Sequence, residues 1–219
     1  MSSALDDSSK GITFFQWMIL GTLTLTSTLY AMSMTIANIA LPQLQGALGA
    51  TQDQIAWTVT FNIVGTAIVT PMTGWLTLRF GQRRLMLCAI FGFATSSILC
   101  GQATALPELV IYRVFQGAFG GPLVPLSQAI ILGVFPRQLH SFATAVWGMG
   151  VVCGPIIGPT VGGYISEAYS WRWIFYIIAP FSLLAFLGAW LYVRNTTHNK
   201  LSKFCLLYTS PSPRDESTS

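Results

Sequence analysis

Charged side chains are scarce in this chain of 219 residues: they make up 8% of it, whereas hydrophobic residues make up 53%. An ordinary soluble domain carries about 25% charged residues. So few charges cannot cover the surface of a 23.8 kDa protein in water. The scarcity excludes a water-soluble domain, and lipid must be the solvent for most of the chain.

Metal-binding and catalytic patterns are also lacking. The four cysteines form no CxxC pair, and the two histidines, His140 and His198, stand alone in the sequence. The motifs HExxH, GxSxG, GxGxxG and GxxxxGK do not occur. The sequence therefore predicts no metal site, no cofactor and no enzyme. The net charge of +4 forms no basic patch interleaved with aromatic residues, so no nucleic-acid partner is expected either.

Long intervals without charge predict an all-α membrane protein. There are six such intervals of 21 residues or more, and a helix needs about 20 apolar residues to cross the hydrocarbon. Residues 1–12 are expected to precede a bundle over 13–194, and 195–219 to form a tail. The first interval contains the polar segment Pro42–Gly46, so we expect the first helix to end near Ile39 and a loop to follow. The predicted spans are about 14–39, 54–77, 85–105, 108–133, 141–165 and 173–193.

Basic residues are distributed unequally between the loops. If the N-terminus is cytoplasmic, only Arg172 lies in an outer loop. By the positive-inside rule, both termini then face the cytoplasm. The cytoplasmic basic residues are Lys10, Arg79, Arg83, Arg84, Arg137, Arg194, Lys200 and Lys203.

Glycine and proline dominate the fifth predicted span. Four of its glycines recur every four residues and form one bare stripe along the helix, which allows another helix to approach at backbone distance. Its prolines each remove a backbone donor and bend the helix. Tight packing alone explains any single glycine equally well, but the whole array favours a shaped and movable helix. The motif comprises Gly150, Gly154, Pro155, Gly158, Pro159, Gly162 and Gly163.

The loop between the second and third spans combines two glycines with three arginines. Gly74 and Gly81 permit a tight turn. Arg79, Arg83 and Arg84 can bond helix-end carbonyls or neighbouring carboxylates. Retention of positive charge on the cytoplasmic side is the simpler explanation of the same residues.

Polar residues also occur inside the predicted spans. Arg113 follows Glu108 by five residues and therefore lies about 7–8 Å inside the fourth span. A charge at that depth is a functional hypothesis, with snorkelling to the outer headgroups as the alternative. Buried amides and hydroxyls must be paired or face a cavity, so they are expected to point inward, as substrate contacts or as interhelical hydrogen bonds. These cavity candidates are Asn38, Asn62, Thr66, Gln116 and Gln128.

Several motifs, in this order, resemble the major facilitator superfamily and in particular its EmrB/QacA-like branch of fourteen-span drug:proton antiporters. The resemblance covers about residues 13–193. It rests on Ile36–Pro42, Gly74–Met86, Ile111–Gly117, Gly121–Gln128, Gly150–Gly163 and Trp171–Phe175.

The resemblance implies the amino-terminal bundle of a transporter, built from two inverted three-helix repeats. It further implies export of amphipathic, lipophilic compounds across a bacterial inner membrane in exchange for protons, with a periplasmic adaptor and an outer-membrane channel as partners. By resemblance, Arg113 takes part in proton coupling, with Glu108 and Asp53 as candidate carboxylates. The glycines and arginines of the second loop would gate the cytoplasmic side, and the Gly-Pro helix would govern closure.

This sequence departs from the branch at three positions. Ser33 stands where an Asp is usual, Leu78 where an acid is usual, and Ile178 where Asn is usual. No carboxylate lies in the middle of a predicted span, and arginine is always charged. We therefore expect Arg113 to modulate the pKa of a carboxylate rather than to carry the proton itself.

The end of the chain changes composition abruptly to Ser, Thr and Pro over residues 203–219. This segment resembles translated sequencing-adaptor read-through, with a disordered cytoplasmic tail as the alternative. Because superfamily transporters pair two bundles, the chain is expected to be an amino-terminal half. A transport-inactive bundle, or a solute importer of the same superfamily, is the alternative function.

Overall fold

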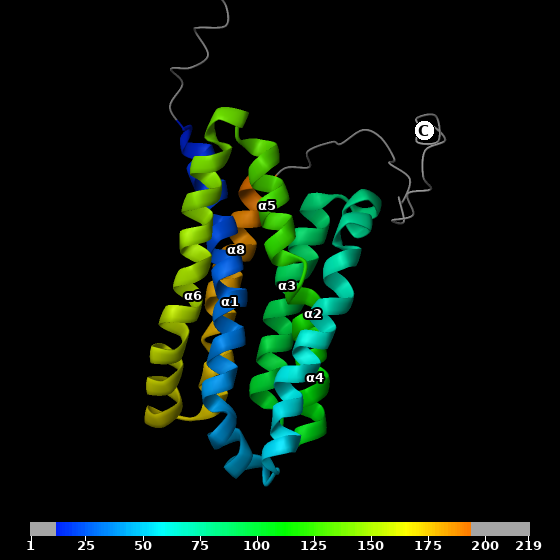
Figure 1. Cartoon of the computed structure of the whole chain (residues 1–219), viewed down its shortest axis with the longest axis vertical. Coiled ribbons are helices and arrows are strands. Elements are labelled where there is room, and N and C mark those ends of the chain that lie inside the picture. Colours follow the sequence, from blue (N-terminus) through cyan, green and yellow to red (C-terminus); the bar gives the residue numbers. More distant parts are fainter. Residues whose placement is uncertain (1–11, 194–219) are drawn as a thin grey trace, which may run out of the picture.

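The computed structural model describes residues 12–193, all of whose regular elements are helical. The N-terminal segment, the tail and the basic residues within them lie outside this range. The helices run side by side as one bundle (Figure 1). They are α1 (Phe14–Leu48), α2 (Gln52–Phe80), α3 (Gln82–Gln102), α4 (Leu106–Gly120), α5 (Leu123–Val134), η2 (Arg137–Leu139), α6 (His140–Ala168), α7 (Trp171–Tyr176) and α8 (Ile178–Tyr192).

Within the described range there are six stretches long and apolar enough to cross a membrane, as the charge-free intervals predicted. The fourth span is divided into α4 and α5, and the sixth into α7 and α8. The fourth is interrupted at Gly121 and Pro122, where a residue without a side chain precedes one without a backbone donor.

The first helix is longer than predicted. We expected a loop after Ile39, but α1 continues through Pro42 to Leu48 and ends at Gly49, whose φ is 59°. Proline removes only one backbone hydrogen bond, whereas the residues around it pack well: Ala40 and Leu44 are both fully buried. Burial therefore outweighs the lost bond, and Figure 1 shows the last turns of α1 bending toward the start of α2.

The burial of the spans repeats in threes. In the most apolar stretch of the first span, half of the residues are buried, and the same holds for the fourth. In the second and the fifth spans the buried share is 22% in each. The third and sixth have intermediate values of 44% and 33%. This periodicity is the pattern expected of two three-helix repeats, with the first helix of each repeat at the centre of the bundle.

Candidate functional site

The glycine stripe of α6 packs against α1. A methyl group added to Gly154 would lie 2.7 Å from the Thr28 backbone oxygen, and one added to Gly150 would overlap the Thr24 side chain. The Thr28 hydroxyl can donate to the Gly150 carbonyl oxygen at 2.8 Å. The two backbones are therefore in contact over several turns, as small-xxx-small packing requires. Gly158 and Gly162 continue the contact along α1, whereas Gly163 and the two prolines lie outside the stripe.

The α2–α4 pair repeats this arrangement with the hydrogen-bonding side chains on the second helix of its repeat rather than on the first. These side chains are on α2, and both helices contribute glycines to the contact, Gly65 on α2 and Gly117 on α4. The Asn62 amide donates to the Arg113 carbonyl oxygen at 2.9 Å, and the Thr66 hydroxyl can donate to the Gly117 carbonyl oxygen at 3.2 Å. A methyl group on Gly117 would overlap the Asn62 backbone oxygen.

The two contacts have equivalent geometry. Gly154 on α6 faces the Thr28 oxygen and the Met32 nitrogen of α1, and Gly65 on α2 faces the Val114 oxygen and the Ala118 nitrogen of α4 in the same way. The first helix of each repeat thus pairs, in parallel, with the second helix of the other repeat. Arg113 is the residue before Val114 on α4, and it places the only charge in the interior of the described spans.

The Arg113 side chain is buried in the bundle, with 1% of its surface exposed. Its Nη1 donates to Gln116 Oε1 at 2.8 Å, and Gln116 Nε2 in turn donates to Ser97 Oγ on α3 at 2.7 Å. The guanidinium carbon lies 4.8 Å from the centre of the Phe175 ring, a cation–π contact. Snorkelling to a headgroup is therefore wrong for this side chain.

Two of the three nitrogens of the Arg113 guanidinium have no hydrogen-bond partner. Nε and Nη2, which form its side-on fork, are buried and unpaired in the described part of the chain. A buried cation with unmet donors is costly. The sequence had identified this residue, but only the structure shows that Gln116, Ser97 and Phe175 hold it.

The described acidic residues are all far from the middle of the spans. Asp53 lies in the first turn of α2 and Glu108 in the first turn of α4, and both are exposed. Glu108 accepts hydrogen bonds at 3.0 Å from the backbone N–H and the hydroxyl of Thr104. Glu167 is in the last turn of α6, so all three are at the same end of the bundle (Figure 1).

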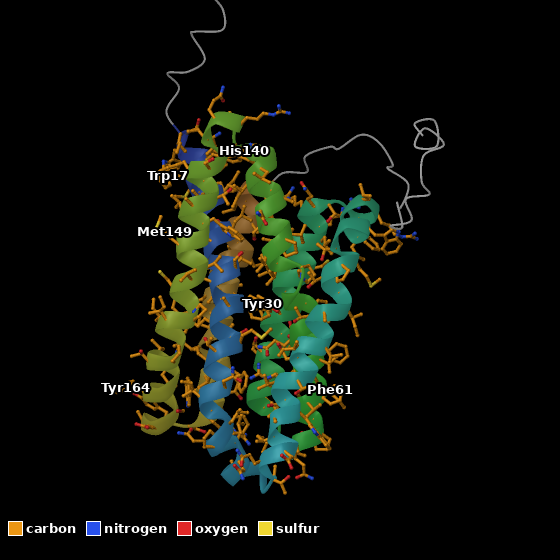
Figure 2. All side chains as sticks on the ribbon, in the orientation of Figure 1. Trp17, Tyr30, Phe61, His140, Met149 and Tyr164 are labelled. Atoms are coloured by element: carbon orange, nitrogen blue, oxygen red, sulfur yellow. The ribbon has the colours of Figure 1, made fainter. Side chains whose placement is uncertain are left out.

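A tyrosine that the sequence analysis missed links the two helix pairs. Tyr30 on α1 is hydrogen-bonded to Thr66 on α2 at 2.9 Å. Its ring lies against Gly120 and makes an edge-on contact with Phe93. Figure 2 shows Tyr30 near the middle of the bundle, between α1 and α2. The signal was present, because a tyrosine in the middle of a span must find a partner for its hydroxyl group.

The cavity candidates separate into two groups. Asn62 and Gln116 are buried and hydrogen-bonded, and Thr66 is half-buried. Asn38 and Gln128 are exposed on the bundle surface. The expectation that all of them point into the bundle is therefore wrong for Asn38 and Gln128, whose side chains need a partner or a polar cavity outside these six spans.

The second loop is a single residue. Gly81 has a φ of 84° and separates α2 from α3, as its predicted role in a tight turn requires. Gly74 is not part of the turn: it lies within α2, exposed, with open space where a side chain would be. Arg79 lies over the Trp75 ring at 5.5 Å, and Arg84 is exposed.

A groove of about 410 Å³ follows the α1–α6 contact toward the N-terminal end of the bundle. Trp17, Leu20, Val146 and other apolar side chains line most of it. Its polar members include Thr24, whose hydroxyl oxygen is buried without a hydrogen-bond partner. Such a surface suits an apolar molecule or acyl chain better than a polar solute.

Two proteins named as multidrug exporters are similar to this chain in sequence. The chain is 45% identical over 168 residues to the multidrug export protein EmrB of Haemophilus influenzae, an alignment that covers 77% of this chain and 33% of the relative. It is 43% identical over 158 residues to EmrB of Escherichia coli K12, covering 72% and 31%. The chain thus spans about a third of the length of these relatives.

Among solved structures, a D-xylose–proton symporter has the same fold, with a TM-score of 0.73 and 19% identity. The match covers 83% of this chain and 49% of the symporter. The Major Facilitator Superfamily pattern matches residues 23–204. Together with the six spans, this shows that the chain is a multi-pass membrane protein and that it belongs to the major facilitator superfamily, a family of carriers rather than enzymes.

Proposed function

We propose that this chain is the amino-terminal bundle of a multidrug efflux permease that exports amphipathic, lipophilic compounds in exchange for protons. The observation that carries the proposal is the similarity to proteins named as multidrug exporters, at 45% and 43% identity. The likeness to a xylose–proton symporter, at 19% identity, supports the fold and leaves a solute importer as a weaker alternative.

Proton coupling is assigned to Arg113 acting on a carboxylate. The unpaired Nε and Nη2 of Arg113 match the two oxygens of a carboxylate, and a nearby cation favours the ionised form of such a group. Glu108 and Asp53 are the carboxylates proposed within this chain, although both lie at the rim. A carboxylate outside the described residues is the alternative partner of Arg113.

The substrate would contact the side of the bundle that carries Tyr30, with Thr66 beside it and the exposed Asn38 and Gln128 on the surface. The glycine contact between α1 and α6 would allow the two helices to shift during closure. Gly74, Gly81, Arg79, Arg83 and Arg84 are proposed to control the cytoplasmic end, because Gly74 leaves open space on α2 for another helix.

Efflux of ethidium tests the proposal. Cells that express the full-length protein are expected to lose ethidium faster than control cells, and a protonophore should abolish the difference. Cells that express this chain alone should show no efflux, because the chain spans about a third of its relatives and transporters of this fold place the site between two bundles. Full efflux from the short chain would show that one bundle suffices, and no efflux from either would support a transport-inactive bundle.

The orientation in the membrane is a separate proposal. The end with Arg79, Arg84 and Arg137 would be cytoplasmic, and so would both termini, in a bacterial inner membrane. The acidic end would then meet the periplasmic adaptor that the resemblance implies.

Labelling of single cysteines checks this orientation, in a chain whose native cysteines are replaced by serine. An impermeant maleimide is expected to label Thr104→Cys in intact spheroplasts, because Thr104 is exposed at the acidic end. It should label Arg137→Cys only after permeabilisation. The reverse pattern would show that the bundle is inserted the other way.

A further inference from the structure

The third and sixth spans are antiparallel neighbours joined by one arginine at each end. Arg83 is the second residue of α3, and its Nη2 donates to the backbone oxygen of Trp190 at 2.6 Å. Trp190 lies in the last turn of α8. Carbonyl groups in the last turn have no donor within their own helix, so the guanidinium supplies one.

At the other end of the bundle the roles are exchanged. Arg172 is the second residue of α7, which begins the sixth span, and its Nη2 donates to the backbone oxygen of Ala103 at 3.2 Å. Ala103 is the residue that ends α3. The guanidinium also lies 5.0 Å from the Trp171 ring, which fixes its direction.

We infer that Arg83 and Arg172 form a reciprocal pair of helix-end clamps that hold the third and sixth spans together as one unit. Each arginine lies at the start of one span and caps the end of the other. The pair therefore follows the same correspondence between the two three-helix repeats as the α1–α6 and α2–α4 contacts. A cation at a helix C-terminus also interacts favourably with the helix dipole. This inference concerns the bundle itself and does not depend on which compound is transported.

The clamp explains two features that topology rules do not. Arg172 is the one basic residue at the acidic end of the described bundle, where the positive-inside rule does not favour it. Arg83 belongs to the loop that resembles a cytoplasmic gate, yet its guanidinium is hydrogen-bonded to α8 of the same bundle. Among the proposed cytoplasmic control residues, Arg83 therefore acts as a positioning residue between α3 and α8, and the exposed Arg79 and Arg84 are the arginines that can contact groups beyond the bundle.

Hydrogen exchange in the purified 219-residue chain tests the clamp, because each arginine caps a helix end distant in sequence. Arg172→Gln is expected to accelerate amide exchange about 5- to 10-fold in the last turn of α3, residues 99–102, and to leave residues 188–192 unchanged. Arg83→Gln should do the opposite, with faster exchange at 188–192 and no change at 99–102.

Arg84→Gln is the matched control, because Arg84 is the exposed neighbour of Arg83, and neither segment should change. The Arg83→Lys and Arg172→Lys variants keep a cationic donor and should stay within about twofold of the parent chain, which separates lost capping from lost packing. They also provide the comparison if a glutamine variant does not fold. Faster exchange in both segments after either single glutamine substitution would overturn the inference. Unchanged exchange in both segments of both glutamine variants would also overturn it.

Discussion

Replacing Gly117 by alanine is expected to disrupt the contact between α2 and α4. The added methyl group would overlap the backbone oxygen of Asn62, which cannot move without moving α2. The hydrogen bonds from Asn62 and Thr66 to α4 depend on the same close approach. Overpacking typically costs about 1–3 kcal/mol, and the rigid neighbour places this substitution at the upper end. The thermal midpoint of the purified bundle in detergent should therefore fall by several degrees, with a lower yield of folded protein.

Gly74→Ala is the control for that experiment. Gly74 also lies within a helix, but no atom is within 4 Å of the position of an added methyl group. Alanine has the higher helix propensity, so the thermal midpoint should stay the same or rise slightly. Equal effects of the two substitutions would contradict the close approach of α2 and α4 at Gly117, because only that approach distinguishes these glycines.

The number of spans could be predicted from sequence because the bilayer imposes a simple requirement on length and polarity. The end of α1 could not. Pro42 and the glutamines around it are typical of a loop, and only the tertiary burial of Leu44 keeps that segment helical. Sequence patterns report local preference, whereas the helix end here is decided by contacts with distant parts of the chain.

The glycine stripe shows a similar limit. The four-residue spacing predicted a bare helix face, but spacing cannot say which helix packs there. The structure shows that α1 does, and that α2 and α4 form an equivalent close contact to which both helices contribute glycines. Polarity alone could not separate the buried Asn62 from the exposed Asn38 either, because both are amides within apolar helices.

Replacing Arg113 by methionine in the full-length protein is expected to separate transport from stability. The guanidinium is buried, with two unpaired nitrogens, and replacing a buried charge by an apolar side chain of similar length is often neutral or stabilising. Methionine can keep the contact with Phe175, while Gln116 loses one donor, at a cost of about 1–3 kcal/mol. These contributions oppose each other, so the thermal midpoint should change little.

Proton-coupled efflux by the same variant should fall at least tenfold, because no cation would remain inside the described spans to adjust the pKa of a carboxylate. Arg137→Met is the control: it also removes an arginine, but an exposed one outside the proposed cytoplasmic control residues, and it should retain efflux. Arg113→Lys tests the geometry of the charge, since an ammonium group cannot present the side-on fork of Nε and Nη2. Full coupled efflux by Arg113→Lys would contradict the proposed role. A large fall in the thermal midpoint of Arg113→Met, with efflux retained by the folded fraction, would instead make Arg113 a structural residue that holds α3, α4 and α7 together.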